Sequence, residues 1–173
     1  MKHPKMKSAA LVFFLIILLG GCSSTTEPEA ALQPLFPDLH GWDLKQVSIT
    51  GAETTLDFKR VDCVWVVGSD NRPSDEPRVT ALAEKLVSIT PGGRVALASD
   101  RYGDFKVGDD NFTRKVVLTF KDRSSFTILI GAPALTKPAY VRLAGSKEVY
   151  WVDESLFKNI SLDKAFWLAD TES

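Results

Sequence analysis

The stretch KVVLTFKDRSSFTILI, residues Lys115–Ile130, carries the pattern that decides the fold. Side chains of a β-strand point alternately to opposite faces, so an apolar residue at every second position predicts a strand with one buried face. This alternation occurs on both sides of the polar turn Asp122-Arg123-Ser124, which predicts an antiparallel hairpin. The alternating residues are Val116, Leu118 and Phe120 before the turn, and Phe126, Ile128 and Ile130 after it.

Shorter segments of the same character lie on both sides of this hairpin and predict a mostly antiparallel sheet or sheets. Ala139–Leu143 and Glu148–Val152 are joined by a short turn that contains Gly145, and they predict a second hairpin. The remaining strand candidates are Gln46–Thr50, Thr54–Lys59, Asp62–Val67 and Arg94–Ser99.

One long amphipathic helix is predicted from Glu76 to Ile89. Ser74 or Asp75 can cap its start. Its apolar residues recur at the spacing of a single helical face, and they are Val79, Leu82, Leu86 and Ile89. Asp153 and Ser161 each precede a segment that predicts a short C-terminal helix. We therefore expect an α+β fold, with mostly antiparallel short strands, one long amphipathic helix and short C-terminal helices.

The first 22 residues indicate export and lipidation. Lys2, Lys5 and Lys7 form a basic start, and Ala9–Leu19 form an apolar run too short for a membrane-spanning helix. The next run, Leu19-Gly20-Gly21-Cys22, resembles the bacterial lipobox. The resemblance implies that residues 1–21 are a lipoprotein signal peptide and that Cys22 carries a diacylglycerol on its thiol and an acyl group such as palmitate on its amine. The alternative is an ordinary signal peptide that precedes an accidental cysteine.

The composition after Cys22 predicts a tether followed by one domain. Residues 22–37 are rich in Ser, Thr, Glu and Pro and predict a flexible tether, and residues 38–170 predict a single α+β domain. In the sorting signals that this region resembles, an Asp after the lipidated cysteine favours the inner membrane. Ser23 stands there instead. We therefore expect a lipid anchor in the outer membrane of the cell envelope, facing the periplasm.

The charge balance argues against nucleic acid as a partner. The chain has 21 Lys and Arg against 22 Asp and Glu, and removal of residues 1–21 with their three lysines leaves 18 against 22. No basic face stands out in the sequence. A nucleic-acid-binding domain usually shows a basic patch or stripe.

Few residues are suited to catalysis. Once Cys22 is lipidated, Cys63 is unpaired, and its alternation with Trp65 and Val67 predicts a small buried apolar residue. His40 is the one histidine left after the leader, which excludes the usual Ser-His-Asp and Cys-His schemes and any multi-histidine metal site. We assign no catalytic residue, no metal ligand and no cofactor.

Four acidic residues in one polar segment are the best candidates for a cation site. Asp100, Asp104, Asp109 and Asp110 could hold Ca²⁺, but their spacing does not match the twelve-residue calcium loop. We interpret this segment as a solvated acidic loop.

Four aromatic residues gather late in the chain, and they are Tyr140, Tyr150, Trp151 and Trp167. Because neighbouring strand residues face opposite ways, Tyr150 and Trp151 cannot share one core. We expect Trp151 inside and Tyr150 half-covered. An exposed aromatic patch for a partner is the alternative.

From Gln46 to Leu168 the chain resembles the bacterial domain-of-unknown-function family 4340. Members of that family occur as lipoproteins and as periplasmic parts of accessory proteins of gliding-motility-type ABC transporters. Asn111-Phe112 departs from the family pattern at a turn that usually contains proline. The resemblance implies no activity and no catalytic residues. The matching segments occur in the family's order: Val47–Thr50, Val64–Val67, Ala81–Leu86, Phe105–Asp110, Val117–Phe120, Ile128–Gly131, Ala139–Arg142 and Val149–Asp153.

Together these features predict a membrane-anchored periplasmic lipoprotein that acts as a non-enzymatic binding or interaction module. Its partners would be the membrane, through Cys22, and an envelope protein or component that the sequence does not name. Two other classes stay open: a hydrolase of the envelope that uses carboxylates alone, and a small-ligand-binding domain that serves a transporter.

Overall fold

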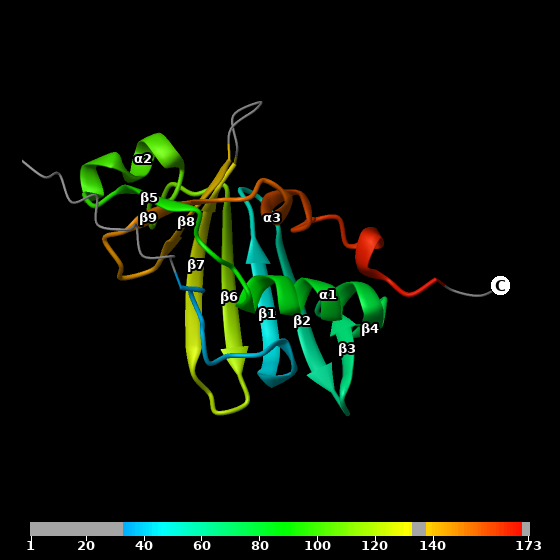
Figure 1. Cartoon of the computed structure of the whole chain (residues 1–173). Helices are drawn as coiled ribbons and strands as arrows, with labels where there is room; N and C mark the ends of the chain where they lie inside the picture. Colours follow the sequence, from blue (N-terminus) through cyan, green and yellow to red (C-terminus); the bar gives the residue numbers. More distant parts are fainter. Residues whose placement is uncertain (1–32, 133–137, 171–173) are drawn as a thin grey trace, which may run out of the picture. The chain divides into compact units, whose positions relative to one another are not determined.

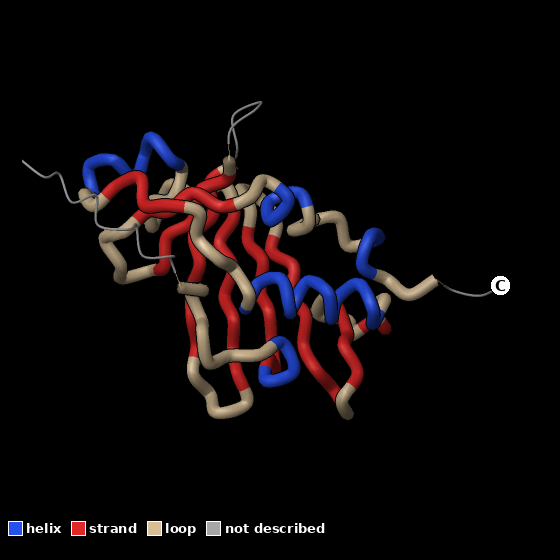
Figure 2. The backbone as a smooth tube through the Cα atoms, viewed as in Figure 1, coloured by secondary structure: helices blue, strands red, loops and turns tan. Residues whose placement is uncertain are grey.

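A computed structural model describes residues 33–132 and 138–170, which belong to one unit, Ala31–Ser173. These residues build one sheet of nine antiparallel strands in the order β4-β3-β2-β1-β6-β7-β8-β9-β5 (Figures 1 and 2). The strands are β1 Leu44–Thr50, β2 Thr55–Val61, β3 Val64–Val67, β4 Arg72–Pro73, β5 Gly93–Ala96, β6 Arg114–Phe120, β7 Ser125–Gly131, β8 Ala139–Leu143 and β9 Val149–Val152.

The helices of the described residues are short. Three are α-helical, namely α1 Glu76–Val87, α2 Tyr102–Phe105 and α3 Ser155–Lys158. Three are single 3-10 turns, namely η1 Gly41–Asp43, η2 Ser99–Arg101 and η3 Ala165–Trp167. None of the helices in the described residues has the length and hydropathy needed to cross a membrane.

The predicted central hairpin is confirmed and lies in the middle of the sheet. In β6 and β7, Val116 pairs with Ile128 and Leu118 pairs with Phe126, which is the register that the alternating pattern requires. Strand β1 adds to the other side of β6, so that Val47 lies opposite Leu118. The first strand in the sequence therefore occupies the fourth place in sheet order, next to a strand more than sixty residues later.

One face of the sheet forms the main core, and α1 packs on it (Figure 1). Asp75 caps α1, because its carboxylate accepts a hydrogen bond from the backbone N–H of Arg78 at 3.0 Å. Trp65 and Trp167 are fully buried in this core, and the ring of Trp167 meets that of Phe58 edge-on at 5.2 Å. The helix residues buried against the sheet are Val79, Leu82, Ala83, Leu86 and Val87.

The expected α+β class with one long helix is wrong. The described residues are mostly β, with one large antiparallel sheet and only short helices. Helix α1 ends at Val87, and Ile89 lies beyond it in non-helical chain, where its carbonyl accepts a hydrogen bond from Leu35 N–H at 2.9 Å. Ile89 has the spacing of the buried helical face and is itself buried, but it lies after the end of α1, next to the N-terminal segment at Leu35.

We expect Leu86→Ala to lower the free energy of unfolding by about 2–5 kcal/mol, because Leu86 is fully buried between α1 and the sheet. Urea denaturation followed by circular dichroism measures the change. Leu97→Ala is the matched control, since Leu97 is 54% exposed and its truncation should cost at most about 0.5 kcal/mol. Equal stabilities of the two variants would show that Leu86 of α1 is not buried against the sheet.

Candidate functional site

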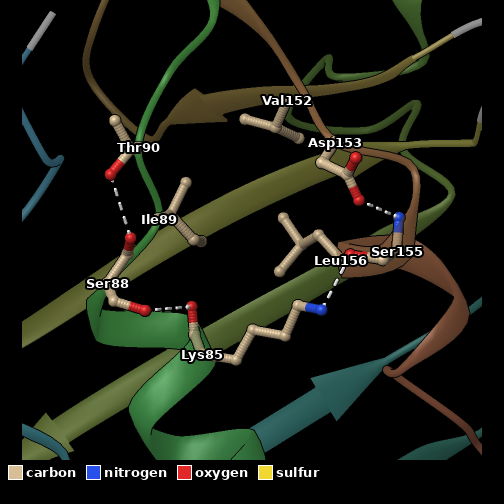
Figure 3. A pocket seen from close by; sticks show the side chains of 8 residues that line it. All are labelled: Lys85, Ser88, Ile89, Thr90, Val152, Asp153, Ser155 and Leu156. Carbon is tan, nitrogen blue, oxygen red and sulfur yellow. Dashed lines mark hydrogen bonds between the residues drawn. The ribbon is translucent and has the colours of Figure 1, made fainter.

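A pocket of about 150 Å³ opens where the end of α1 meets the chain between β9 and α3 (Figure 3). Helix α1 presents one side of the pocket, and the segment that leaves β9 presents the other. Its apolar lining is buried, whereas hydroxyl groups and two charged side chains line the remainder. The lining residues are Lys85, Ser88, Ile89, Thr90, Val152, Asp153, Ser155 and Leu156.

Lys85 and Asp153 are linked across this pocket through Ser155. The ammonium of Lys85 donates a hydrogen bond to Ser155 Oγ at 2.8 Å, and Asp153 Oδ1 accepts one from the backbone N–H of Ser155 at 2.8 Å (Figure 3). The hydrogen bonds from the Ser155 hydroxyl and backbone N–H hold the pKa of Asp153 below its usual value. The nearby charges of Lys85 and Lys158 act in the same direction.

This arrangement suits binding better than nucleophilic catalysis. An activated serine has to give its proton to a neighbouring base. Ser155 Oγ instead accepts a hydrogen bond from the Lys85 ammonium, and the Asp153 carboxylate that its hydroxyl contacts has a lowered pKa and is therefore a weak base. An apolar floor with a few converging polar groups is the usual composition of a small-molecule site.

A second hollow of about 280 Å³ lies on the other side of Lys85, between α1 and the C-terminal segment. Arg78 reaches across its rim. Its guanidinium donates to the carbonyl of Phe166, pairs with Asp75 at 3.1 Å and lies 4.6 Å from the centre of the Phe166 ring. These contacts fasten the C-terminal segment to α1 and satisfy the charge of Arg78. Lys85 is thus the cation shared by the two hollows.

Two of the four aspartates of the acidic loop pair with arginines. Asp104 pairs with Arg101 at 2.8 Å, and Asp109 pairs with Arg142 at 2.6 Å, while Asp100 is exposed. Asp110 is exposed as well. Within residues 33–132 and 138–170, no three His, Cys, Asp or Glu side chains are grouped closely enough to hold a metal ion. The structure therefore does not bring the four carboxylates together as a cation site.

Arg142 is the group that holds this loop on the second face of the sheet. It is 2% exposed, and it donates to the carbonyls of Val107 at 2.8 Å and Ser146 at 3.1 Å in addition to Asp109. Its guanidinium also stacks on the ring of Tyr102, 4.2 Å from the ring centre. Gly131 allows Phe105 of α2 to lie close to β7, since a Cβ at position 131 would lie 1.8 Å from the carbonyl oxygen of Phe105.

Cys63 is exposed, so its expected place in the core is wrong. It sits with Asp62 in the two-residue turn between β2 and β3, and both have positive φ angles, 49° for Asp62 and 69° for Cys63. This is the backbone of a hairpin turn that usually contains Asn or Gly. The alternation with Trp65 stops at the turn, so the pattern did not extend to Cys63.

The aromatic residues divide between core and surface. Tyr150 is half-buried as expected, and Trp167 is fully buried, but Trp151 is 40% exposed and not inside. Its indole lies against Gly92, which has no side chain to displace it. His40 is exposed and stacks on Trp42 at 4.1 Å between ring centres.

Sequence reasoning missed the pocket around Lys85, Asp153 and Ser155. The sequence places Lys85 in the predicted helix, off its apolar face, and Asp153 directly before a predicted short helix. Sixty-eight positions separate Lys85 from Asp153, and no local motif links them. Cys22, the predicted lipidation site, lies outside the described residues.

The fold and the pocket define a mostly β domain with a candidate binding site beside its largest helix. Residues 65–171 match the model of a family described as a domain of unknown function, DUF4340. The match covers more than half of the chain, so the protein belongs to this family. No curated protein and no solved structure matches the chain significantly.

We expect Arg142→Ala to lower the free energy of unfolding by at least about 3 kcal/mol, because three hydrogen bonds of a buried charged group are lost together. Hydrogen exchange should show faster exchange in residues 99–112. Arg101→Ala is the matched control, since its pair with Asp104 is exposed and contributes about 0–1 kcal/mol. An Arg142→Ala protein as stable as the control would contradict the role of Arg142.

The lowered pKa of Asp153 predicts a pH dependence of stability. A carboxyl whose pKa is lower in the folded state stabilises the fold above its ordinary value of 3.8, and this contribution is lost as the pH falls. The difference in urea midpoint between wild type and Asp153→Asn should therefore be largest near neutral pH and shrink below pH 3.8. Asp57→Asn controls for the loss of one exposed negative charge on β2. A difference independent of pH would refute the prediction.

Proposed function

We propose that the protein is a lipid-anchored lipoprotein of the bacterial cell envelope whose domain acts as a non-enzymatic binding module. The observation that carries the anchor is the run Leu19-Gly20-Gly21-Cys22 directly after a basic and then apolar leader. Outer-membrane anchoring, with the domain in the periplasm, is supported by Ser23 in the position where an Asp would favour the inner membrane.

The side-chain contacts support binding over hydrolysis. A hydrolase that uses carboxylates alone needs two of them placed on either side of a substrate bond. The carboxylates of Asp104 and Asp109 are instead paired with Arg101 and Arg142, and the pair of Asp109 with the buried Arg142 holds the loop on the sheet. The pocket at Lys85 offers an apolar floor with hydroxyl and charged groups, which is a composition suited to a ligand.

A role beside an ABC transporter has narrower support. It comes from the resemblance to family 4340, some of whose members are accessory proteins of such transporters. An anchored periplasmic domain with a ligand pocket is compatible with that role. The partner would then be a periplasmic part of the transporter or a small solute.

We expect Cys22→Ser to abolish lipidation and to release the protein from the membrane fraction, because the serine cannot form the thioether. Fractionation of cells and mass spectrometry of the mature N-terminus measure the outcome. Cys63→Ser is the matched control, since it removes the other cysteine and should leave both lipidation and fractionation unchanged. A Cys22→Ser protein that is still acylated and membrane-bound would contradict the proposed lipid anchor at Cys22.

The same cells test the choice of membrane on a density gradient. The wild-type protein should sediment with outer-membrane markers, and Ser23→Asp should move it towards the inner-membrane fraction. A wild-type protein found only with inner-membrane markers would contradict outer-membrane anchoring while leaving the lipid anchor in place.

A further inference from the structure

The rim of the pocket at Lys85 carries one positive and one negative group, each with unused hydrogen-bonding capacity. An ammonium has three N–H donors, and one from Lys85 is spent on Ser155 Oγ. Within the described residues, no carboxylate oxygen lies within 4.0 Å of Lys85 Nζ. A carboxylate has about four acceptor sites, and Asp153 uses its Oδ1 on the Ser155 backbone.

The two charges flank an apolar floor. Ile89, Val152 and Leu156 form this floor and are themselves almost fully buried, so their positions are set by the core beneath them. A volume of about 150 Å³ can hold a molecule the size of benzene, and in this pocket three of the eight lining side chains are aliphatic. The floor therefore has room for a side chain of three or four carbons, while charged atoms remain at the open rim.

These features select a ligand that carries both charges. A simple carboxylate would meet Lys85 but would be repelled by Asp153, and a simple amine would meet Asp153 but would be repelled by Lys85. An internal peptide residue carries neither group. A zwitterion with an apolar side chain can pair with both charges while its side chain packs on the apolar floor.

We propose that this pocket binds an aliphatic α-amino acid. The ligand carboxylate accepts hydrogen bonds from the Lys85 ammonium, the ligand ammonium donates to Asp153, and the side chain lies on Ile89, Val152 and Leu156. Both charged side chains contact Ser155, which links the two sides of the pocket (Figure 3). The hydroxyls of Ser88 and Thr90 lie on the α1 side of the same rim.

This inference rests on the proposed binding role and not on the lipid anchor. The Cys22→Ser protein should bind the ligand as wild type does, and a failure to bind would leave fractionation unchanged. The two proposals therefore fail separately.

Equilibrium dialysis of the full-length protein in detergent with radiolabelled leucine, valine or isoleucine tests the ligand class. We expect saturable binding with a stoichiometry of one. N-acetyl-leucine lacks the ammonium and leucinamide lacks the carboxylate, so each should bind at least about tenfold more weakly, as expected for one lost charge-assisted hydrogen bond. No saturable binding, or equal binding of the capped forms, would overturn the proposal.

Variants then test the site. Lys85→Met and Asp153→Asn should each weaken leucine binding at least about tenfold, and urea denaturation establishes that the variants are folded. Lys158→Met is the matched control, because Lys158 pairs with Glu154 on the outside of α3 and does not line the pocket. Unchanged affinity in both pocket variants would place the ligand elsewhere and refute this site. If either variant fails to fold, the comparison of free and capped leucine on the wild-type protein still decides.

Discussion

The sheet presents more apolar surface than its helices can cover, and the rest of the structure follows from this constraint. One face of nine strands carries the main core, but α1 has only twelve residues. The remaining cover comes from chain without regular structure at both ends of the domain. Phe36 before η1 and Trp167 in η3 are both almost fully buried in that core. Antiparallel sheets need such cover on one face only, since the other can be solvated.

Cover built from separate segments leaves gaps where the segments meet. Both hollows beside Lys85 lie along such a junction, between α1 and the chain that follows β9. The polar contacts at the junction, Lys85 with Ser155 and Arg78 with the Phe166 carbonyl, hold the segments together without filling the space between them. A binding site thus arises here as a consequence of how the sheet is covered.

The second face of the sheet is covered at one end only, and by a different means. There the cluster of Val107, Leu129 and Val149 is small, so apolar burial alone contributes little. Arg142 stabilises the cover on this face instead, through hydrogen bonds to two backbone carbonyls and one carboxylate. A buried arginine is stable in this setting because its donors are satisfied and Asp109 balances its charge. Asp109 of the acidic loop therefore has a structural role.

Local pattern was sufficient for eight of the nine strands, and it missed the two-residue β4. The alternation in residues 115–130 predicted β6, β7 and their antiparallel pairing, and Asp75 was among the predicted helix caps. Both features depend on neighbours within a few residues, where side-chain direction follows directly from the backbone period. The family was also visible in the order of these segments, and the match over residues 65–171 confirms it.

Tertiary contacts decided what the local pattern could not. Ile89 continued the helical stripe, yet its backbone is held by Leu35, more than fifty residues earlier. Cys63 continued the strand alternation, yet the hairpin turned there and exposed it. The contact of Lys85 with Ser155 depends on where the fold places α3 relative to α1, since the two residues are seventy positions apart in sequence. The sequence by itself determined the antiparallel strands, the family and the leader pattern that ends at Cys22. Only the tertiary structure determined the single large sheet, the end of α1 and the pocket, because each depends on burial by residues distant in the chain.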